Sequence, residues 1–421
     1  MTVTSETDGK GGPEKPRGAR GLGARSGASE FVRHWSLDPD VAFLNHGSFG
    51  ACPIPVLEAQ TRLRSRLERG PVQFLHRELD ELANSARTET AVFVGVDPDD
   101  LVFVPNATTG VNTVLRSLSF EAGDELLTTS HEYNACRNAM EFVAGRSGAR
   151  VVAVDVPFPV ESSDEIVELL LDGASDRTRL AVIDHITSLT GMVMPIRGIV
   201  RALTERGIDT LVDGAHGPGM LPLDITDISP AYYTGNCHKW LCAPKGAAIL
   251  YVRHDRQPSI RPLTISHGAN SRRTDASRFQ LEFGWTGTLD PTAYLCIPES
   301  IRFMGSLLPG GWPELMERNR KLALGARALL CDAVGVGPAC PDEMIGTLAS
   351  VPLSEGTYHF TTTALEFDEL DAVLREEYGF EVPVLAYPPG PASIVRVAAQ
   401  IYNSIEQYAA LADTLKMLLG R

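Results

Sequence analysis

The sequence lacks a long apolar run, a surplus of basic residues and a paired cysteine motif, and each absence excludes a class of protein. No stretch of about 18 apolar residues occurs, so we expect no membrane-spanning helix. Acidic side chains number 53 against 38 basic ones, a net charge of −15, whereas a sequence-independent nucleic-acid binder needs a basic stripe. The seven cysteines form no CxxC pair, so we expect reduced thiols in a cytoplasmic protein.

The rest of the composition is that of a globular protein. Hydrophobic residues make up 43% and charged residues 22% of the 421 residues, and this length allows two or three domains. Residues 1–30 contain almost no large apolar side chain, so we predict a disordered tail. We assign residues 66–300 to a large ligand-binding domain, and residues 31–65 and 301–421 to a small α+β domain.

Short apolar runs alternate with helical patterns through the middle of the chain. The predicted strands cover residues 101–104, 125–128, 151–156, 180–183, 210–212 and 247–252. This alternation predicts an α/β fold with a mostly parallel sheet flanked by helices. Ligands of such folds bind outside the carboxyl ends of the strands. After residue 300 we predict helices over 301–334, 365–377 and 405–419, with short strands over 347–351, 357–362 and 394–398.

Polar residues follow several of the predicted strands. Thr108 and Thr109 open a helix whose N-terminus suits a phosphate. Tyr133 could stack on a flat ligand, and Asp213 ends a buried strand, where a carboxylate needs a cationic partner. Lys239 lies in the segment YTGNCHKW (233–240), beside a histidine and a tryptophan, and could act as a nucleophile once its pKa is lowered. Each feature alone also has an ordinary explanation, such as a cap, a turn or a surface lysine.

Two ligand hypotheses account for these residues. The pairs Asp184–His185 and Asp213–His216 suit a divalent metal, but a metal leaves the Thr-Thr-Gly helix start and Lys239 unexplained. Pyridoxal 5′-phosphate needs a phosphate anchor, a stacking partner, an acid at the pyridine nitrogen and a lysine for its aldehyde. The sequence supplies these four in that order, so we favour this cofactor and predict no metal.

Nine short segments also match one family in the same order. They are FLNHGSFG (43–50), FLHREL (74–79), NATTGVN (106–112), HEYNA (131–135), TSLTG (187–191), DGAHGPG (213–219), GNCHKW (235–240), WTGTLDP (285–291) and RVAAQIYN (396–403). Together they resemble the class V aminotransferase family of fold type I pyridoxal-phosphate enzymes. The most similar branch is that of isopenicillin N epimerase-like proteins and the C–S lyases that act on cysteine S-conjugates. The similarity covers about residues 40–420.

The resemblance implies a role for each matching residue. Lys239 would form the Schiff base and serve as the main acid and base, Asp213 would pair with the pyridinium nitrogen, and Tyr133 would stack on the ring. The other implied cofactor ligands are His216, Thr108, Thr109, Ser188, Asn236 and His238, with Gly287 and Thr288 reaching the phosphate of the partner subunit in a homodimer. The implied substrate ligands are Arg396 for the α-carboxylate, with Asn45, Arg77 and Tyr387 as further candidates.

The chain departs from the family pattern at two positions. Leu189 stands where the family has proline, and Gly217 stands where it has alanine. Neither change removes a charged group, so the prediction of cofactor binding is unaffected.

The reaction is less well defined than the cofactor. Our first hypothesis is a C–S β-lyase that acts on a cysteine S-conjugate in sulfur natural-product metabolism. The alternatives are an amino-acid or peptide epimerase, a decarboxylating oxidative deaminase and an aminotransferase. A cysteine desulfurase is disfavoured because residues 380–395 contain no cysteine. A non-catalytic scaffold is disfavoured because Lys239, Asp213 and Arg396 are all present.

Overall fold

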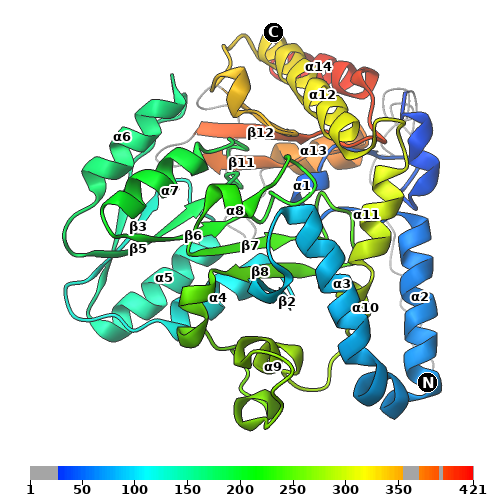
Figure 1. Cartoon of the computed structure of the whole chain (residues 1–421). Helices are drawn as coiled ribbons and strands as arrows, with labels where there is room; N and C mark the ends of the chain where they lie inside the picture. The colour runs from blue at the N-terminus through cyan, green and yellow to red at the C-terminus, as the bar shows by residue number, and fades with distance from the viewer. Residues whose placement is uncertain (1–26, 354–368, 388–391, 421) are drawn as a thin grey trace, which may run out of the picture.

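A seven-stranded sheet lies at the centre of the molecule (Figure 1). The computed structural model describes residues 27–353, 369–387 and 392–420. The strands are β2 (Leu101–Val104), β3 (Glu125–Thr129), β4 (Arg150–Val154), β5 (Thr178–Asp184), β6 (Asp209–Asp213), β7 (Tyr232–Asn236) and β8 (Ala248–Val252). Their order is β2-β8-β7-β6-β5-β3-β4. Only β8 pairs antiparallel, with β2 and β7, so the predicted mostly parallel α/β sheet is confirmed.

All six strands predicted for this sheet are present, and β7 was missed. Its sequence, YYTGN, contains a glycine and an asparagine, which are depleted in strands. All five of its residues are nevertheless buried, because β7 lies between β6 and β8. Burial between neighbouring strands therefore outweighs the local preference.

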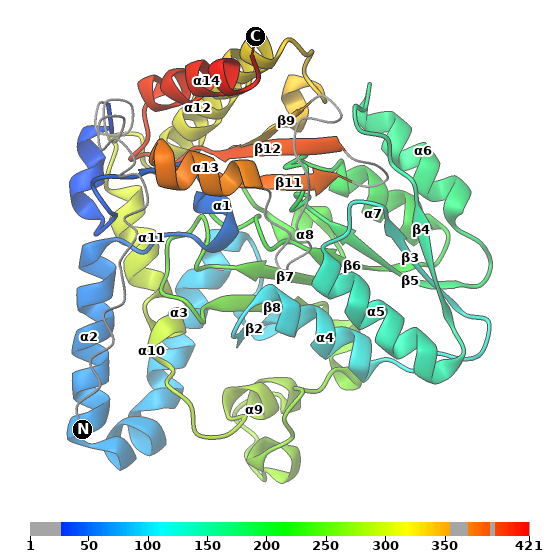
Figure 2. The same cartoon turned by 180° about the vertical axis from the view of Figure 1, so that it is seen from behind.

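Helices cover both faces of the sheet (Figures 1 and 2). On one face lie α4 (Ala107–Ser117) and α5 (Asn134–Ser147), and on the other lie α6 (Ser163–Gly173), α7 (Ile196–Glu205) and α8 (Ile225–Ile228). Successive residues of β5 enter different cores: Leu180 and Val182 pack with the α4–α5 side, and Ala181 and Ile183 pack with the α6–α7 side. This explains why the strand is a continuous apolar run.

Two long helices, α2 (Ile54–Arg69) and α3 (Leu79–Val94), stand at the side of the sheet and are joined by a π-helix over Gln73–Glu78. The short helices α9 (Arg278–Gly284), α10 (Thr292–Leu295) and α11 (Ile297–Gly305) follow the sheet in the chain. Helix α2 continues through residue 65, where we placed a domain boundary. The division at residues 65 and 300 stays a prediction.

The C-terminal part forms a second, antiparallel sheet with its own helices. Strands β11 (Val384–Tyr387), β12 (Ala392–Ala398) and β9 (Leu348–Pro352) lie in that order, below α12 (Gly311–Val334) and α14 (Ile405–Leu418) in Figure 1. Near the N-terminus, β1 (Ala42–Phe43) precedes α1 (His46–Phe49) and pairs in parallel with β10 (Phe380–Glu381), which follows α13 (Glu369–Glu377) in the sequence. The predicted strand over 357–362 and residues 1–26 of the predicted tail lie outside the described residues.

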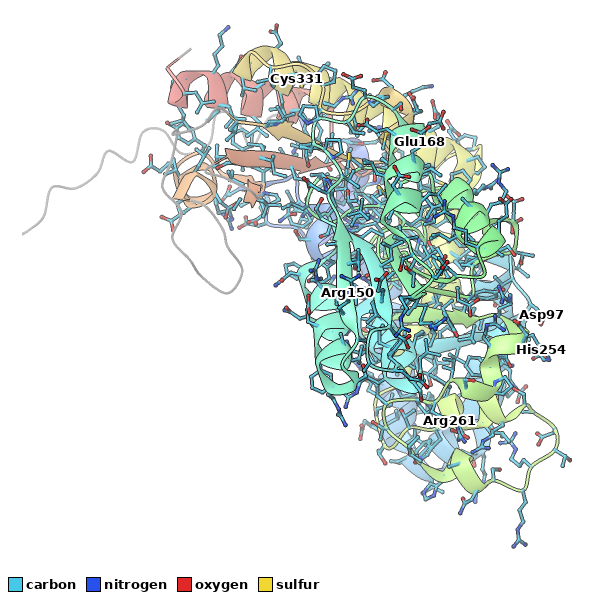
Figure 3. The ribbon with its side chains drawn as sticks, turned by 90° about the vertical axis from the view of Figure 1, so that its left-hand side faces the viewer. Asp97, Arg150, Glu168, His254, Arg261 and Cys331 are labelled. Atoms are coloured by element: carbon cyan, nitrogen blue, oxygen red, sulfur yellow. The ribbon has the colours of Figure 1, made fainter. Side chains whose placement is uncertain are left out.

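The cysteines and the helices agree with two sequence expectations. All seven cysteines are free thiols. Figure 3 shows one of them, Cys331 of α12, at the opposite end of the molecule from Arg261. Among the described residues, no helix combines the length and the apolar character that crossing a bilayer requires.

Candidate active site

The polar residues predicted at the strand ends meet at one edge of the main sheet. Asp184 ends β5, Asp213 ends β6 and Asn236 ends β7. Asp184 and Asp213 are direct neighbours in the parallel ladder. The side chain of Asn236 accepts a hydrogen bond from the amide of Ala107, the first residue of α4, at 2.8 Å. The carboxyl ends of three strands and one helix N-terminus therefore share one site.

The N-terminus of α4 has the form of a phosphate site. Asn106 caps the helix: its Oδ1 accepts from the amide of Thr109 at 2.8 Å and from the Thr109 hydroxyl at 3.0 Å. His238 lies after β7, and its Nδ1 donates to the carbonyl of Ala247 at 3.1 Å, because a carbonyl can only accept. The bond from Ala107 to Asn236 joins the end of β7 to the start of α4, which carries the predicted phosphate ligands Thr108 and Thr109. The partial positive charge at the helix start suits an anion.

Lys239 has a desolvated amine beside an imidazole. Its Nζ lies 3.2 Å from Nε2 of His216. The residue as a whole is partly exposed, but its amine is shielded from water, and this desolvation, together with the charge of Arg396, lowers the pKa of Lys239 to about 8. Part of the amine is therefore neutral near pH 7, as nucleophilic attack on an aldehyde requires.

The backbone of Lys239 is fixed by the segment around β1 and α1. His46 Nε2 lies 3.0 Å from the Lys239 carbonyl, so this nitrogen carries the ring proton and Nδ1 accepts from the Tyr402 hydroxyl at 2.8 Å. Gly50 has φ 70°, and a Cβ there would lie 2.1 Å from the carbonyl oxygen of His238. The FLNHGSFG motif thus shapes the turn that presents the lysine.

Asp213 is a buried carboxylate with two hydrogen-bond donors. Its Oδ1 accepts from the amide of Ala215 at 2.9 Å, and its Oδ2 accepts from the thiol of Cys136 at 3.0 Å. Burial raises the pKa of Asp213, whereas these two bonds and the charge of Lys239 lower it. The two bonds and the lysine favour the ionised form that a pyridinium partner must have.

Two further acids lie beside Asp213, and the three together are called the carboxyl floor: Glu132, Asp184 and Asp213. Glu132 accepts from the Thr128 hydroxyl at 2.8 Å through Oε2, while its Oε1 and the Oδ2 of Asp184 are buried without a partner. Burial and the neighbouring acids raise the pKa of Glu132 and of Asp184 well above the usual values. The neutral forms of Glu132 and Asp184 are therefore favoured, whereas the donors to Asp213 and the charge of Lys239 offset part of the rise in the pKa of Asp213 and make it the best placed of the three to carry a charge.

Tyr133 stands at the entrance to the site. It precedes the first residue of α5 and is 44% exposed. Desolvation and the nearby Cys136 and Asp213 raise the pKa of Tyr133, so the side chain is an uncharged phenol at neutral pH. An aromatic ring that is half open to solvent and lies next to the carboxyl floor suits a stacking partner for a bound ring.

Arg396 supplies a buried cation on the small sheet. It lies on β12 and is 5% exposed. Its guanidinium donates to the Ser48 hydroxyl at 2.9 Å and to the Ser188 carbonyl, whereas its Nε is buried without a partner. The Ser48 hydroxyl in turn donates to Asn45 Oδ1 at 2.6 Å. The arginine is thus held in place with hydrogen-bonding capacity to spare, as a carboxylate clamp requires.

Three predicted site residues, Arg77, Gly287 and Thr288, lie away from this edge within one chain. Arg77 is exposed and donates to Gln73 Oε1 at 2.9 Å, on the π-helix at the far end of α2 and α3 in Figure 1. Gly287 lines a separate cavity of about 880 Å³ that also touches Pro105, and Thr288 is exposed. Tyr387 ends β11, and its side chain lies outside the described residues.

Sequence analysis missed several residues of the site and left one departure unexplained. The missed residues are His46, Ser48, Glu132 and Cys136, and all four lie in or beside motifs that matched the family for other residues. The departure at Gly217 has a steric reason. A Cβ at Gly217 would lie 2.0 Å from the hydroxyl of Tyr233, which is bonded to Nδ1 of His185 at 3.0 Å.

Each part of the site fits one part of pyridoxal 5′-phosphate. The α4 N-terminus suits its phosphate, the carboxyl floor suits its pyridine nitrogen, and the desolvated amine of Lys239 suits its aldehyde. The fold and the site define a pyridoxal 5′-phosphate-dependent enzyme of fold type I, as the resemblance implied.

The chain belongs to the class V aminotransferase family, whose model, "Aminotransferase class-V", matches residues 56–307. It is 35% identical to isopenicillin N epimerase of Amycolatopsis lactamdurans, over 91% of this chain and 96% of the relative. It is 32% identical to a probable chloroplastic L-cysteine desulfhydrase of Arabidopsis thaliana, over 93% and 85%. A solved complex of the cystine C–S lyase C-DES with its product cysteine persulfide has the same fold, with a TM-score of 0.74 at 22% identity, over 89% of this chain and 97% of that one.

Proposed function

We propose that the protein cleaves the C–S bond of a cysteine S-conjugate in sulfur natural-product metabolism, as a pyridoxal-phosphate β-lyase. The observation that carries this proposal is that a buried arginine with an unpaired Nε lies near a desolvated lysine amine. The charge of Arg396 acts on Lys239 and lowers its pKa, so the two groups are neighbours. An amino acid whose carboxylate binds Arg396 therefore has its amine and Cα near Lys239.

The residues divide the work of such a reaction between them. Arg396 would bind the α-carboxylate and orient the bond to be broken. Lys239 would hold the cofactor and then, as a free amine, take the Cα proton. The bound cofactor supplies an electron sink for the pair left at Cα. The Cβ–S bond would then break with its electron pair on sulfur, which takes up a proton and leaves as a thiol, and the remaining three-carbon unit with its α-nitrogen would react with water to give pyruvate and ammonia.

The thiols of the chain support a lyase over a sulfur transferase. The thiol of Cys136 donates a hydrogen bond to Asp213. Cys237 is fully buried, and desolvation raises its pKa. Neither is an exposed thiolate that could attack a substrate sulfur. Residues 380–395, which lead up to Arg396 in the sequence, contain no cysteine. Sulfur would therefore leave with the departing group. The names of the desulfhydrase and C–S lyase relatives point the same way.

The test is incubation with S-substituted cysteines and assay for pyruvate and the released thiol. We expect both products in equal amounts from the wild-type protein with its cofactor. Lys239→Ala should lose turnover by at least about four orders of magnitude, as expected for a residue that does covalent chemistry. Lys245→Ala is the matched control, because Lys245 follows the same turn but donates to the carbonyl of Gly50 at 2.9 Å. The absence of pyruvate from every S-conjugate would overturn the proposal.

An epimerase is the second candidate, and one observation favours it. Epimerisation needs an acid on the ring face opposite the lysine, and the protonated phenol of Tyr133, near Arg396, is a group of the right kind. The relative with 35% identity is named as such an enzyme. In deuterated buffer, an epimerase would exchange the Cα proton with inversion and form no pyruvate.

We also propose that the protein works as a homodimer in the cytoplasm. The segment of Gly287 and Thr288 borders a cavity next to the start of α4, and Leu289 nearby is 47% exposed, so a second subunit would cover apolar surface there. The seven free cysteines suit a reducing compartment. Light scattering of the protein with its cofactor should give twice the mass of 45.5 kDa.

A further inference from the structure

A buried indole N–H lies behind the imidazole that faces Lys239. Trp240 is 1% exposed, and its Nε1 donates to Nδ1 of His216 at 3.1 Å. The other ring nitrogen of His216, Nε2, lies 3.2 Å from Nζ of Lys239. Trp240 and Lys239 are adjacent in the chain, so one turn supplies both partners of the same ring.

The donor inventory of these groups fixes the position of one proton. An indole N–H can only donate, so Nδ1 of His216 must be the unprotonated acceptor. Desolvation and the charge of Lys239 keep the pKa of His216 well below its usual value, so the ring is neutral and its single proton lies on Nε2. Nε2 is then a donor, and the amine of Lys239 can form a hydrogen bond with it only as the acceptor. An ammonium group has no lone pair to accept with.

We propose that Trp240 is a positioning residue for Lys239: its indole N–H fixes His216 as the Nε2-protonated tautomer, which favours the neutral amine of Lys239. Neither the family comparison nor the sequence motif assigns a role to this tryptophan. The inference concerns the lysine before any substrate binds, so it holds for a lyase and an epimerase alike. The same N–H on Nε2 remains a donor toward a cofactor oxygen once Lys239 has bonded to the aldehyde.

Other groups also act on Lys239, and the test must separate them from Trp240. Arg396 of β12 lowers the pKa of the amine, whereas Asp213 of β6, Asp184 of β5 and Cys136 of α5 raise it. The ring of His46 also packs against Trp240, with the two ring centroids 4.9 Å apart and an angle of 48° between the ring planes. Among the described residues, none of these groups forms a hydrogen bond with Nδ1 of His216, whose donor is the indole of Trp240, so removal of the indole N–H changes that nitrogen selectively.

The first experiment reads the tautomer directly in the cofactor-free protein. The protein is labelled with ¹⁵N-histidine, and the His216 signals are identified by their loss in His216→Gln. We expect Nε2–H and an unprotonated Nδ1 in the wild type, and a mixture of tautomers in Trp240→Phe. A wild-type ring that is protonated on Nδ1, or on both nitrogens at pH 7.5, would overturn the proposal, and this result does not depend on whether the variant folds.

The second experiment measures the amine. Trace acetylation of the cofactor-free protein at a series of pH values, with mass spectrometry of the Lys239 peptide, gives the fraction of neutral amine. In Trp240→Phe the midpoint should move to higher pH, with roughly three- to tenfold lower reactivity at pH 7.5, the effect of one hydrogen bond. Trp312→Phe is the matched control, since its Nε1 donates to the carbonyl of Ile301 at 2.9 Å, and it should leave the midpoint unchanged.

A double variant shows whether Trp240 acts through the histidine. Glutamine at position 216 keeps an amide nitrogen near the place of Nε2 and has no atom equivalent to Nδ1. Trp240→Phe should therefore change the Lys239 midpoint in the wild-type background and not in the His216→Gln background. An equal change in both backgrounds would show that the tryptophan acts by packing alone, and would refute the proposal.

Discussion

The carboxyl floor and the substrate side of the site carry opposite charges and come from different parts of the chain. The floor consists of three acids at the ends of strands in the main sheet and at the start of α5. The substrate side carries the cation Arg396 of the small sheet beside the desolvated amine of Lys239. A net charge of −15 therefore says little about the site, where an acid faces a ring nitrogen and a cation faces a carboxylate.

The two regions also differ in how their charges are stabilised. In the floor, burial and the neighbouring acids raise the pKa of Glu132 and of Asp184 well above the usual values, whereas hydrogen bonds and the charge of Lys239 offset part of the rise at Asp213. On the substrate side, burial lowers the pKa of Arg396 to about 10, so the guanidinium stays charged at neutral pH. The floor favours a single negative charge, on Asp213. On the substrate side, the positive charge of Arg396 is stabilised by hydrogen bonds to Ser48 and Ser188.

The largest effect should come from removing the single charge of the floor. Asp213→Asn leaves a pyridinium nitrogen without its anion, and breaking one buried ion pair costs about 3 kcal/mol or more, so kcat should fall about 100-fold or more. Asp184→Asn and Glu132→Gln replace acids whose raised pKa favours the neutral form, so they should reduce kcat less than about fivefold at pH 7.5. Steady-state kinetics with saturating cofactor measures all three. Equal losses in the three variants would show that the charge is not confined to Asp213.

The next effect concerns Lys239 in the cofactor-free protein. Its pKa is about 8 when folded, against 10.5 as the ordinary value. Between these pH values the unfolded chain binds more protons than the folded one, so this group makes the folded state more stable as the pH rises. The difference in unfolding free energy between wild type and Lys239→Met should change by at most about 3 kcal/mol from pH 7.5 to 10.5.

Urea unfolding of the two cofactor-free proteins at each pH measures this difference, because other titrating groups are common to both. The wild type should gain stability relative to the variant as the pH rises. A difference that stays constant across this range would mean that the lysine is not desolvated.

A smaller effect is expected from the clamp on the substrate side. Arg396→Lys keeps a charge but loses the planar fork that binds a carboxylate with two parallel bonds. We expect a 10- to 100-fold loss of kcat/KM, about 1.5 to 3 kcal/mol, mostly as a higher KM, with unchanged affinity for the cofactor. A loss of cofactor affinity with unchanged KM would show that Arg396 binds the cofactor rather than the substrate carboxylate.

The smallest effect should come from the support of that clamp. Ser48→Ala removes the hydroxyl that links Arg396 to Asn45. One hydrogen bond is worth about 1 kcal/mol, so kcat/KM should fall roughly fivefold. Ser306→Ala is a suitable control, because that hydroxyl bonds a carbonyl within its own helix end at 2.7 Å. A loss as large as that of Arg396→Lys would show that the serine itself contacts the substrate.

The sequence was sufficient for the parts of the site that depend on strand ends. A parallel sheet brings the carboxyl ends of its strands to one edge, so Asp213 and the start of α4 could be placed together from the order of strands alone. The strand β7 before Lys239 was harder to predict, because YYTGN lacks a strand-like composition and depends on burial between two neighbours.

Contacts between distant segments could not be predicted in the same way. The bonds from Ser48 to Arg396 and from His46 to the Lys239 carbonyl span 348 and 193 positions of the chain, and no local pattern encodes them. The raised pKa of Glu132 and of Asp184 depends on three acids being buried together, which is visible only in the fold. The glycine at position 217 is likewise explained only by the fold, which places the Tyr233 hydroxyl where a Cβ would lie.

The most direct test of the central claim asks which lysine holds the cofactor. Borohydride reduction of the protein with its bound cofactor links the two permanently, and peptide mass spectrometry then locates the modified residue. We predict modification of Lys239 alone, in the wild type and in Asp213→Asn, and none in Lys239→Ala. Modification of Lys245 or of any other lysine in the wild type would contradict the site described here.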